Sequence, residues 1–167
     1  MTANMDDIKL LRIYLNDHLA GSVAGYELAK RTQSNNEGTP LGDYLIGFMQ
    51  ELREDQAAVE RLLDSIDATP DRLKQMAAWI AEKAGRVKLN GQITGYSDLS
   101  RLLELEGLCL GVEGKLSLWR SLMQVAGHHP MLAVTELDDL IARAGSQREK
   151  LEEFRLGAAA VAFGAAL

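Results

Sequence analysis

The chain has 167 residues and a formal net charge of −6, with 47% hydrophobic, 25% charged and 5% aromatic residues. This length is typical of one domain, here residues 1–167, that buries a core without disulfide bonds or structural metal ions. The single cysteine excludes an intramolecular disulfide and a cysteine-based zinc site, and the acidic balance argues against general nucleic-acid binding.

Composition also indicates the fold class and the cellular setting. Leu, Ala, Glu and Arg are frequent while aromatic residues are scarce, and this balance favours helices over sheets. Residues 1–7 contain neither the basic nor the apolar segment of a secretory signal, and no stretch reaches the ~20 apolar residues of a membrane-spanning helix. We therefore expect an all-α, cytoplasmic protein that binds neither nucleic acid nor a membrane.

Two long helices are predicted in the first part of the chain. The first runs over about residues 5–33, where apolar residues recur at helical spacing before the turn-forming residues 34–38. The second runs over about residues 39–67, since Thr39 can cap a helix whose first position is Pro40. Because the link between them is short, these helices should form an antiparallel hairpin.

One shorter helix and two further long helices are predicted after this hairpin. A Thr-Pro pair begins a helix over about residues 70–87. Ser97 caps a helix over about residues 98–125, and a last helix runs over about residues 136–163. Each of the four long helices carries an apolar stripe, and packing these stripes together makes an antiparallel four-helix bundle.

In this bundle one long crossover, which holds the extra short helix, joins the second and third long helices. Residues 100–106 (Ser-Arg-Leu-Leu-Glu-Leu-Glu) and 110–115 (Leu-Gly-Val-Glu-Gly-Lys) are similar to stretches of uncharacterised bacterial helical proteins. The order of elements resembles the ferritin-like superfamily, whose bundles have one such crossover. The resemblance implies a ferritin-like fold over nearly the whole chain.

The metal ligands of ferritin-like di-iron proteins are missing from the predicted bundle helices. Those proteins place a Glu on each of two helices and a Glu-x-x-His pair on each of the other two, because two hard cations need carboxylates and imidazoles. Of the three histidines only His18 falls in a bundle helix, and no Asp or Glu precedes any histidine by three residues. We therefore predict no cofactor and no standard di-iron site.

His18 and Asp55 are the candidate site residues. Both interrupt apolar stripes, and counting outward from the first hairpin turn puts them at one height in the bundle, so we predict a contact between them. With Glu51 one turn away, they could form a nonstandard metal site or an acid–base pair. The simpler interpretation is a buried imidazole whose hydrogen-bonding capacity a carboxylate satisfies.

Two structural ion pairs are predicted between the third and fourth long helices. Counted from the loop that joins these helices, Glu113 matches Arg148 in height and Glu106 matches Arg155. Charge pairs beside an apolar stripe are usually structural. These carboxylates would then be neutralised by arginine, which indicates that this half of the bundle is filled.

Glycines and other small residues indicate close packing against a further element. Gly107, Gly111 and Gly114 lie within one predicted helix, where each is about 1 kcal/mol less favourable than alanine. Close approach of another backbone, from the crossover helix or a second subunit, would explain them. The first two long helices carry further glycines with the same implication, at Gly21, Gly25, Gly42 and Gly47. The small-residue segment 157–164 could pack on a second copy, so we expect a homo-oligomer, most simply a dimer.

These patterns favour a non-catalytic binding or structural module of ferritin-like fold. One alternative is a metal-binding or oxidoreductase-type protein of the same fold, with a site at His18, Asp55 and Glu51. Another is a helical adaptor that docks a protein partner. The metal content of the purified protein distinguishes the first alternative from the non-catalytic module. Co-purification of a protein partner tests the second alternative.

Overall fold

The computed structural model describes residues 5–66, 95–130, 132 and 136–165. Within these ranges the chain forms no strand and has four α-helices, which are α1 (Met5–Asn35), α2 (Pro40–Ile66), α4 (Asp98–Val125) and α5 (Leu137–Ala162). A short 3₁₀ turn, Ala126–His128, follows α4. The helix predicted over residues 70–87 lies outside the described residues. None of the described helices is both long and apolar enough to cross a bilayer.

Local signals set the ends of these helices. Thr39 Oγ1 accepts a hydrogen bond from the Gly42 backbone N–H at 3.2 Å at the start of α2. Ser97 Oγ accepts one from the Ser100 backbone N–H at 3.1 Å at the start of α4. Gly38, in the turn between α1 and α2, has a φ of 73°, which glycine adopts without strain. The cap residues predicted from the sequence therefore begin both helices.

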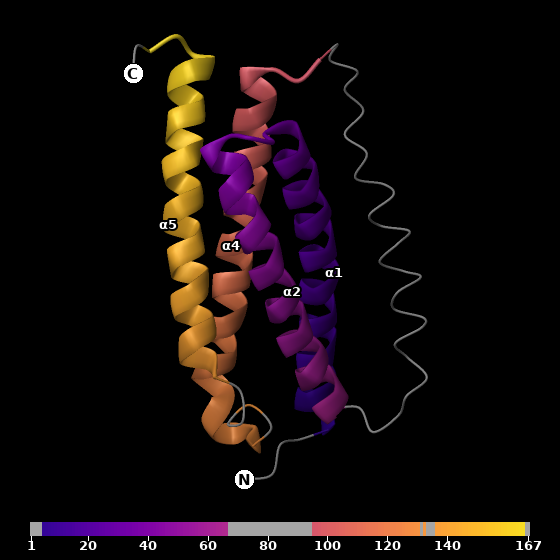
Figure 1. Ribbon diagram of the computed structural model, residues 1–167. Helices are drawn as coiled ribbons and strands as arrows, with labels where there is room; N and C mark the ends of the chain where they lie inside the picture. Colours follow the sequence, from indigo (N-terminus) through magenta and orange to yellow (C-terminus); the bar gives the residue numbers. More distant parts are fainter. Residues whose placement is uncertain (1–4, 67–94, 131, 133–135, 166–167) are drawn as a thin grey trace.

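The helices pack side by side as a helical bundle (Figure 1). A short turn joins α1 to α2 at one end of the molecule, and α4 joins α5 at the opposite end. Packing is most extensive between α4 and α5, and α1 packs on both α2 and α4, whereas α2 and α5 touch little. Helices α1, α2 and α4 therefore enclose one side of the bundle interior.

The hydrophobic core is divided into two clusters along the bundle. The first includes Leu15 and Leu19 of α1 with Trp119 of α4, and the second includes Phe48 of α2 with Leu105 of α4. On each helix the two clusters are separated by several residues. The fully buried residues in these gaps are polar, Asp55 on α2 and Gln147 on α5, so a polar layer lies between two apolar halves.

The turn between α1 and α2 is attached to the beginning of α4 through Asn36. This side chain is only 3% exposed. Its Nδ2 donates to the Thr32 carbonyl oxygen at 2.7 Å and to Tyr96 Oη at 2.8 Å, and its Oδ1 accepts from Arg101 Nε at 2.8 Å. The amide thereby satisfies its hydrogen-bonding groups and holds the α1–α2 pair against α4.

Candidate functional site

A network of charged and amide side chains crosses the middle of the bundle at Asp55. Asp55 is 4% exposed, and its Oδ2 lies 2.5 Å from Lys115 Nζ of α4. Its Oδ1 accepts a hydrogen bond from the guanidinium of Arg143 on α5. Lys115 also donates to Gln147 Oε1, and Gln147 Nε2 donates to Glu51 Oε2 at 2.5 Å. Three helices are therefore connected through polar contacts in this layer.

The electrostatics of this network depend on burial. The Lys115 side chain is 11% exposed, and loss of hydration lowers its pKa, while the neighbouring Asp55 carboxylate acts in the opposite direction. A buried ammonium is tolerated only when a counter-charge and acceptors replace water. Asp55 and Gln147 supply both, so Lys115 is held in place by groups of α2 and α5.

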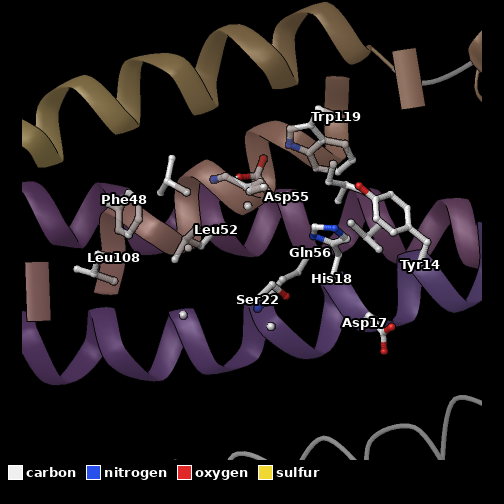
Figure 2. A pocket seen from close by; sticks show the side chains of 18 residues that line it. Tyr14, Asp17, His18, Ser22, Phe48, Leu52, Asp55, Gln56, Leu108 and Trp119 are labelled. Carbon is white, nitrogen blue, oxygen red and sulfur yellow. The ribbon is translucent and has the colours of Figure 1, made fainter. Parts of the chain in front are cut away.

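A cavity of about 460 Å³ lies beside this network, between α1, α2 and α4 (Figure 2). Its wall is mainly apolar and includes Phe48, Leu52, Val112 and Trp119. Polar side chains are fewer, and they come from all three helices, at Tyr14, Asp17, His18, Ser22, Asp55, Gln56 and Lys115. An apolar space with a few convergent polar groups is the usual form of a small-molecule site.

Glycines open this cavity. Gly21 and Gly25 of α1 and Gly111 and Gly114 of α4 line it, and a Cβ added at any of the four would meet none of the described residues within 4 Å. No described residue approaches these four positions, and the expected partners, the crossover helix or a second copy, lie outside the described residues, so that expectation stays a prediction. Absence of side chains here enlarges the cavity, although each glycine is about 1 kcal/mol less favourable than alanine in a helix.

Close approach does occur at two other predicted glycines. A Cβ at Gly107 would lie 2.8 Å from Leu28 Cδ2 of α1, and one at Gly42 would lie 2.1 Å from the Asn36 carbonyl oxygen. A Cβ at Gly47, on the exposed side of α2, would meet no described residue within 4 Å, so the expected contact there stays a prediction. Sequence spacing did not separate these cases, because a missing Cβ is compatible with tight contact and with open space.

His18 is half-buried in the cavity wall, next to Tyr14 of the same helix (Figure 2). The two rings meet edge to face, with centroids 4.6 Å apart and planes at 77°. Tyr14 Oη donates to Ser121 Oγ of α4 at 3.3 Å. Loss of hydration lowers the pKa of His18, and the nearby Asp17 carboxylate partly opposes this effect.

The structure brings the three candidate site residues into one region but gives them different partners. His18 and Asp55 both line the cavity, yet in the described part of the chain no hydrogen bond or ion pair joins them. The two Asp55 oxygens bind Lys115 and Arg143 instead. Glu51 binds Gln147. The carboxylate is therefore not hydrogen-bonded to His18, as the simpler interpretation required, but to cationic partners from α4 and α5.

The contacts of Asp55 also affect whether His18, Glu51 and Asp55 could bind a metal ion. Among the residues that the structure describes, no group of three or more His, Cys, Asp or Glu side chains could hold a metal ion. Both oxygens of Asp55 are already bound by cations, which compete with any metal for the carboxylate. A metal centre at His18, Glu51 and Asp55 stays a prediction from the sequence.

The two ion pairs expected between the last two helices lie near the surface. Arg148 Nε is 2.5 Å from Glu113 Oε2, with both side chains about half exposed. Arg155 is 3.8 Å from Glu106 Oε1 and also binds Glu152 of its own helix at 2.6 Å. Such exposed pairs contribute about 0–1 kcal/mol each, so their effect on stability is small.

Sequence reasoning missed Lys115, Arg143 and Gln147 as members of the central network. Gln147 occupies the core position between Ala144 and Leu151, and all three of these α5 residues are buried. That interruption of an apolar stripe is the same signal that identified Asp55. Lys115 and Arg143 gave no such signal, since a long side chain beside a stripe can point outward or inward.

The altered pKa of His18 predicts a pH effect on stability. A histidine whose pKa is lower in the folded state penalises folding when protonated, so stability is complete above about pH 6.5 and decreases as pH falls toward the lowered value. Urea unfolding of wild type and His18→Leu across this range should show the variant gaining relative stability as pH falls. A difference in the free energy of unfolding between the two proteins that is the same at every pH would contradict burial of His18.

Function has to be inferred from this geometry. Comparisons with models of protein families, with curated proteins and with solved structures find no match for the chain. The features that bear on function are the cavity between α1, α2 and α4 and the polar network beside it.

Proposed function

We propose that the protein is a non-catalytic binding module with a ferritin-like, antiparallel four-helix bundle, and that the cavity between α1, α2 and α4 holds an apolar small molecule. The observation that carries the proposal is the 460 Å³ cavity, whose wall is mostly apolar. Ligand sites commonly have volumes of about 300–1,000 Å³ and few polar groups. The cavity therefore has the size and chemistry of a small-molecule site.

The glycines around the cavity support ligand binding over a purely structural role. Alanine at Gly21, Gly25, Gly111 or Gly114 would meet no neighbour in the described part of the chain and would strengthen the helix. A chain that needed only stability would gain from closing this space, because an empty cavity forfeits packing contacts. Glycine at these positions is favourable when the space is occupied.

The central network supports a non-catalytic role. A general acid or base has to reach its substrate and exchange a proton with it. Asp55 is bound by Lys115 and Arg143, and Lys115 is also bound by Gln147. These groups are engaged with one another, so we assign the network to structure. The proposal also includes three expectations from the sequence. These are a short helix in the crossover, self-association as a dimer and a cytoplasmic location.

Fluorescence of the neutral apolar probe N-phenyl-1-naphthylamine tests the proposal. We expect saturable binding to wild type, and at least about a tenfold loss of affinity in Gly25→Leu and in Gly111→Leu, which fill the cavity from α1 and from α4. The matched control is Gly47→Leu, an exposed position on α2 with open space around it. Its affinity should stay within about twofold of wild type.

Two results would contradict the proposal. The first is a wild-type protein that does not bind the probe. The second is binding that all three leucine variants leave unchanged, since the probe would then lie elsewhere on the protein. Circular dichroism should show that each variant stays helical, because none of the three positions has a neighbour within 4 Å of the added Cβ.

A further inference from the structure

The two ends of the cavity differ in chemistry (Figure 2). Phe48, Leu52 and Leu108 lie toward one end, whereas Tyr14 and His18 lie toward the other. The cavity follows the helix axes, since its α1 lining runs from residue 14 to residue 25, a rise of about 16 Å at 1.5 Å per residue. An elongated occupant with one apolar end and one polar end would match this gradient.

The polar end holds hydrogen-bonding groups that the described protein does not use. His18 of α1 and Gln56 of α2 are half-buried in the cavity wall, and neither makes a hydrogen bond with the described residues. Trp119 of α4 is fully buried in the same wall, and its Nε1 has no hydrogen-bond partner. Buried polar groups normally have partners, so the unpartnered Trp119 Nε1, at the same end as the unused polar groups of His18 and Gln56, points to a ligand.

The charges around the cavity select against a charged head group. Asp17 and Asp55 are the acidic residues of the wall, and Lys115 is its one basic residue among those described. The Lys115 ammonium is already bound by Asp55 and Gln147, so a ligand anion would have to displace a buried counter-charge. Burial also favours the neutral form of His18. A cationic head group at His18 and Gln56 would lose hydration against a mainly apolar wall.

We infer that the ligand is an uncharged, elongated amphipathic molecule of the long-chain alcohol or carbonyl class. Its oxygen hydrogen-bonds His18 and Gln56, which can donate and accept, and its hydrocarbon chain extends toward Phe48 and Leu108. This inference rests on the proposed function, because it names the class of molecule that the same cavity takes.

Displacement of bound N-phenyl-1-naphthylamine tests the head group. The three competitors share a ten-carbon chain and differ in charge: 1-decanol, decanoate and decyltrimethylammonium. We expect 1-decanol to compete at least about tenfold better than either ion, because an uncompensated charge in a poorly hydrated site is unfavourable. Equal or better competition by decanoate or by the ammonium compound would overturn the inference, as would failure of all three to displace the probe.

Substitution at the polar end tests the position of the oxygen. His18→Phe keeps an aromatic ring and removes the hydrogen-bonding nitrogens, so 1-decanol should bind about fivefold to fiftyfold more weakly while the probe binds within about twofold of wild type. His128→Phe, an exposed histidine beyond α4, is the matched control and should change neither affinity. Unchanged 1-decanol affinity in His18→Phe would overturn the inference.

The two levels of the proposal fail in different ways. If wild type does not bind the probe, the cavity is not a ligand site and the proposed function fails together with this inference. If the probe binds and Gly111→Leu abolishes its binding, but 1-decanol is not preferred, only the inference about ligand class fails.

Discussion

Replacing Asp55 with alanine is expected to lower the free energy of unfolding by about 3–5 kcal/mol, because it leaves a buried ammonium without its counter-charge. Asp55 is 4% exposed, and its carboxylate forms ion pairs with both Lys115 and Arg143. The Lys115 side chain is 11% exposed, so water cannot fully replace the lost carboxylate. Urea unfolding followed by circular dichroism measures the change.

The neighbouring residue provides the control for this variant. Glu54 also binds Arg143, at 3.0 Å, but its side chain is 51% exposed. Glu54→Ala should therefore lower the free energy of unfolding by less than about 1 kcal/mol. A similar loss in the Glu54 and Asp55 variants would mean that burial does not set the strength of this network.

The Asp55→Ala variant should also respond to pH. Burial lowers the pKa of Lys115 while Asp55 opposes this, so removing Asp55 should lower the pKa further. A lysine whose folded-state pKa is below its unfolded value penalises folding while it is protonated, so the variant should regain stability as pH rises toward about 10.4, the ordinary pKa of lysine. In the double variant Asp55→Leu/Lys115→Met, more than half of the loss should be recovered. If the stability losses of the two single variants simply add in the double variant, Asp55 and Lys115 do not interact.

Replacing Gly42 with alanine is expected to lower the free energy of unfolding by about 3 kcal/mol, although alanine is the better helix former. The added Cβ would lie 2.1 Å from the Asn36 carbonyl oxygen and 2.8 Å from its carbonyl carbon. That carbonyl accepts hydrogen bonds from the Thr39 hydroxyl at 2.7 Å and from its backbone N–H at 3.2 Å. The backbone turn, and not a flexible side chain, would therefore have to move.

Gly47→Ala in the same helix is the matched control for this contact. Gly47 is exposed, and its added Cβ would meet nothing within 4 Å. It should raise the free energy of unfolding by about 0.5–1 kcal/mol, as alanine does in an open helix interior. The same methyl group thus has opposite expected effects five residues apart. Equal effects at the two positions would mean that α2 does not begin against the Asn36 carbonyl.

The helices themselves followed from local sequence. Ranges 5–33, 39–67, 98–125 and 136–163 were expected, and the structure has Met5–Asn35, Pro40–Ile66, Asp98–Val125 and Leu137–Ala162. Apolar spacing and capping act within one or two turns of chain, so they can be recognised without knowledge of distant residues. The ends differ by no more than two residues because the last turn of a helix has few constraints.

The candidate site was accessible to sequence analysis only in part. Asp55 interrupts an apolar stripe, and the structure does bury it. His18 was assigned as its partner because the two residues lie at the same height on neighbouring helices. The structure places both residues in the wall of one cavity. Height does not show which side chains reach inward from the remaining helices, and here two cations from α4 and α5 bind the two carboxylate oxygens.

The sequence by itself determined the helical class, the helix ends and the positions where polar residues interrupt the apolar stripes, because these depend on short-range periodicity. Only the tertiary structure decided which charges meet Asp55 and where the glycines leave space. Gly42 and Gly111 are the same residue in similar helices, yet one lies against a carbonyl and the other against a cavity. That difference arises because contacts between helices depend on their rotation and separation, which local sequence does not encode.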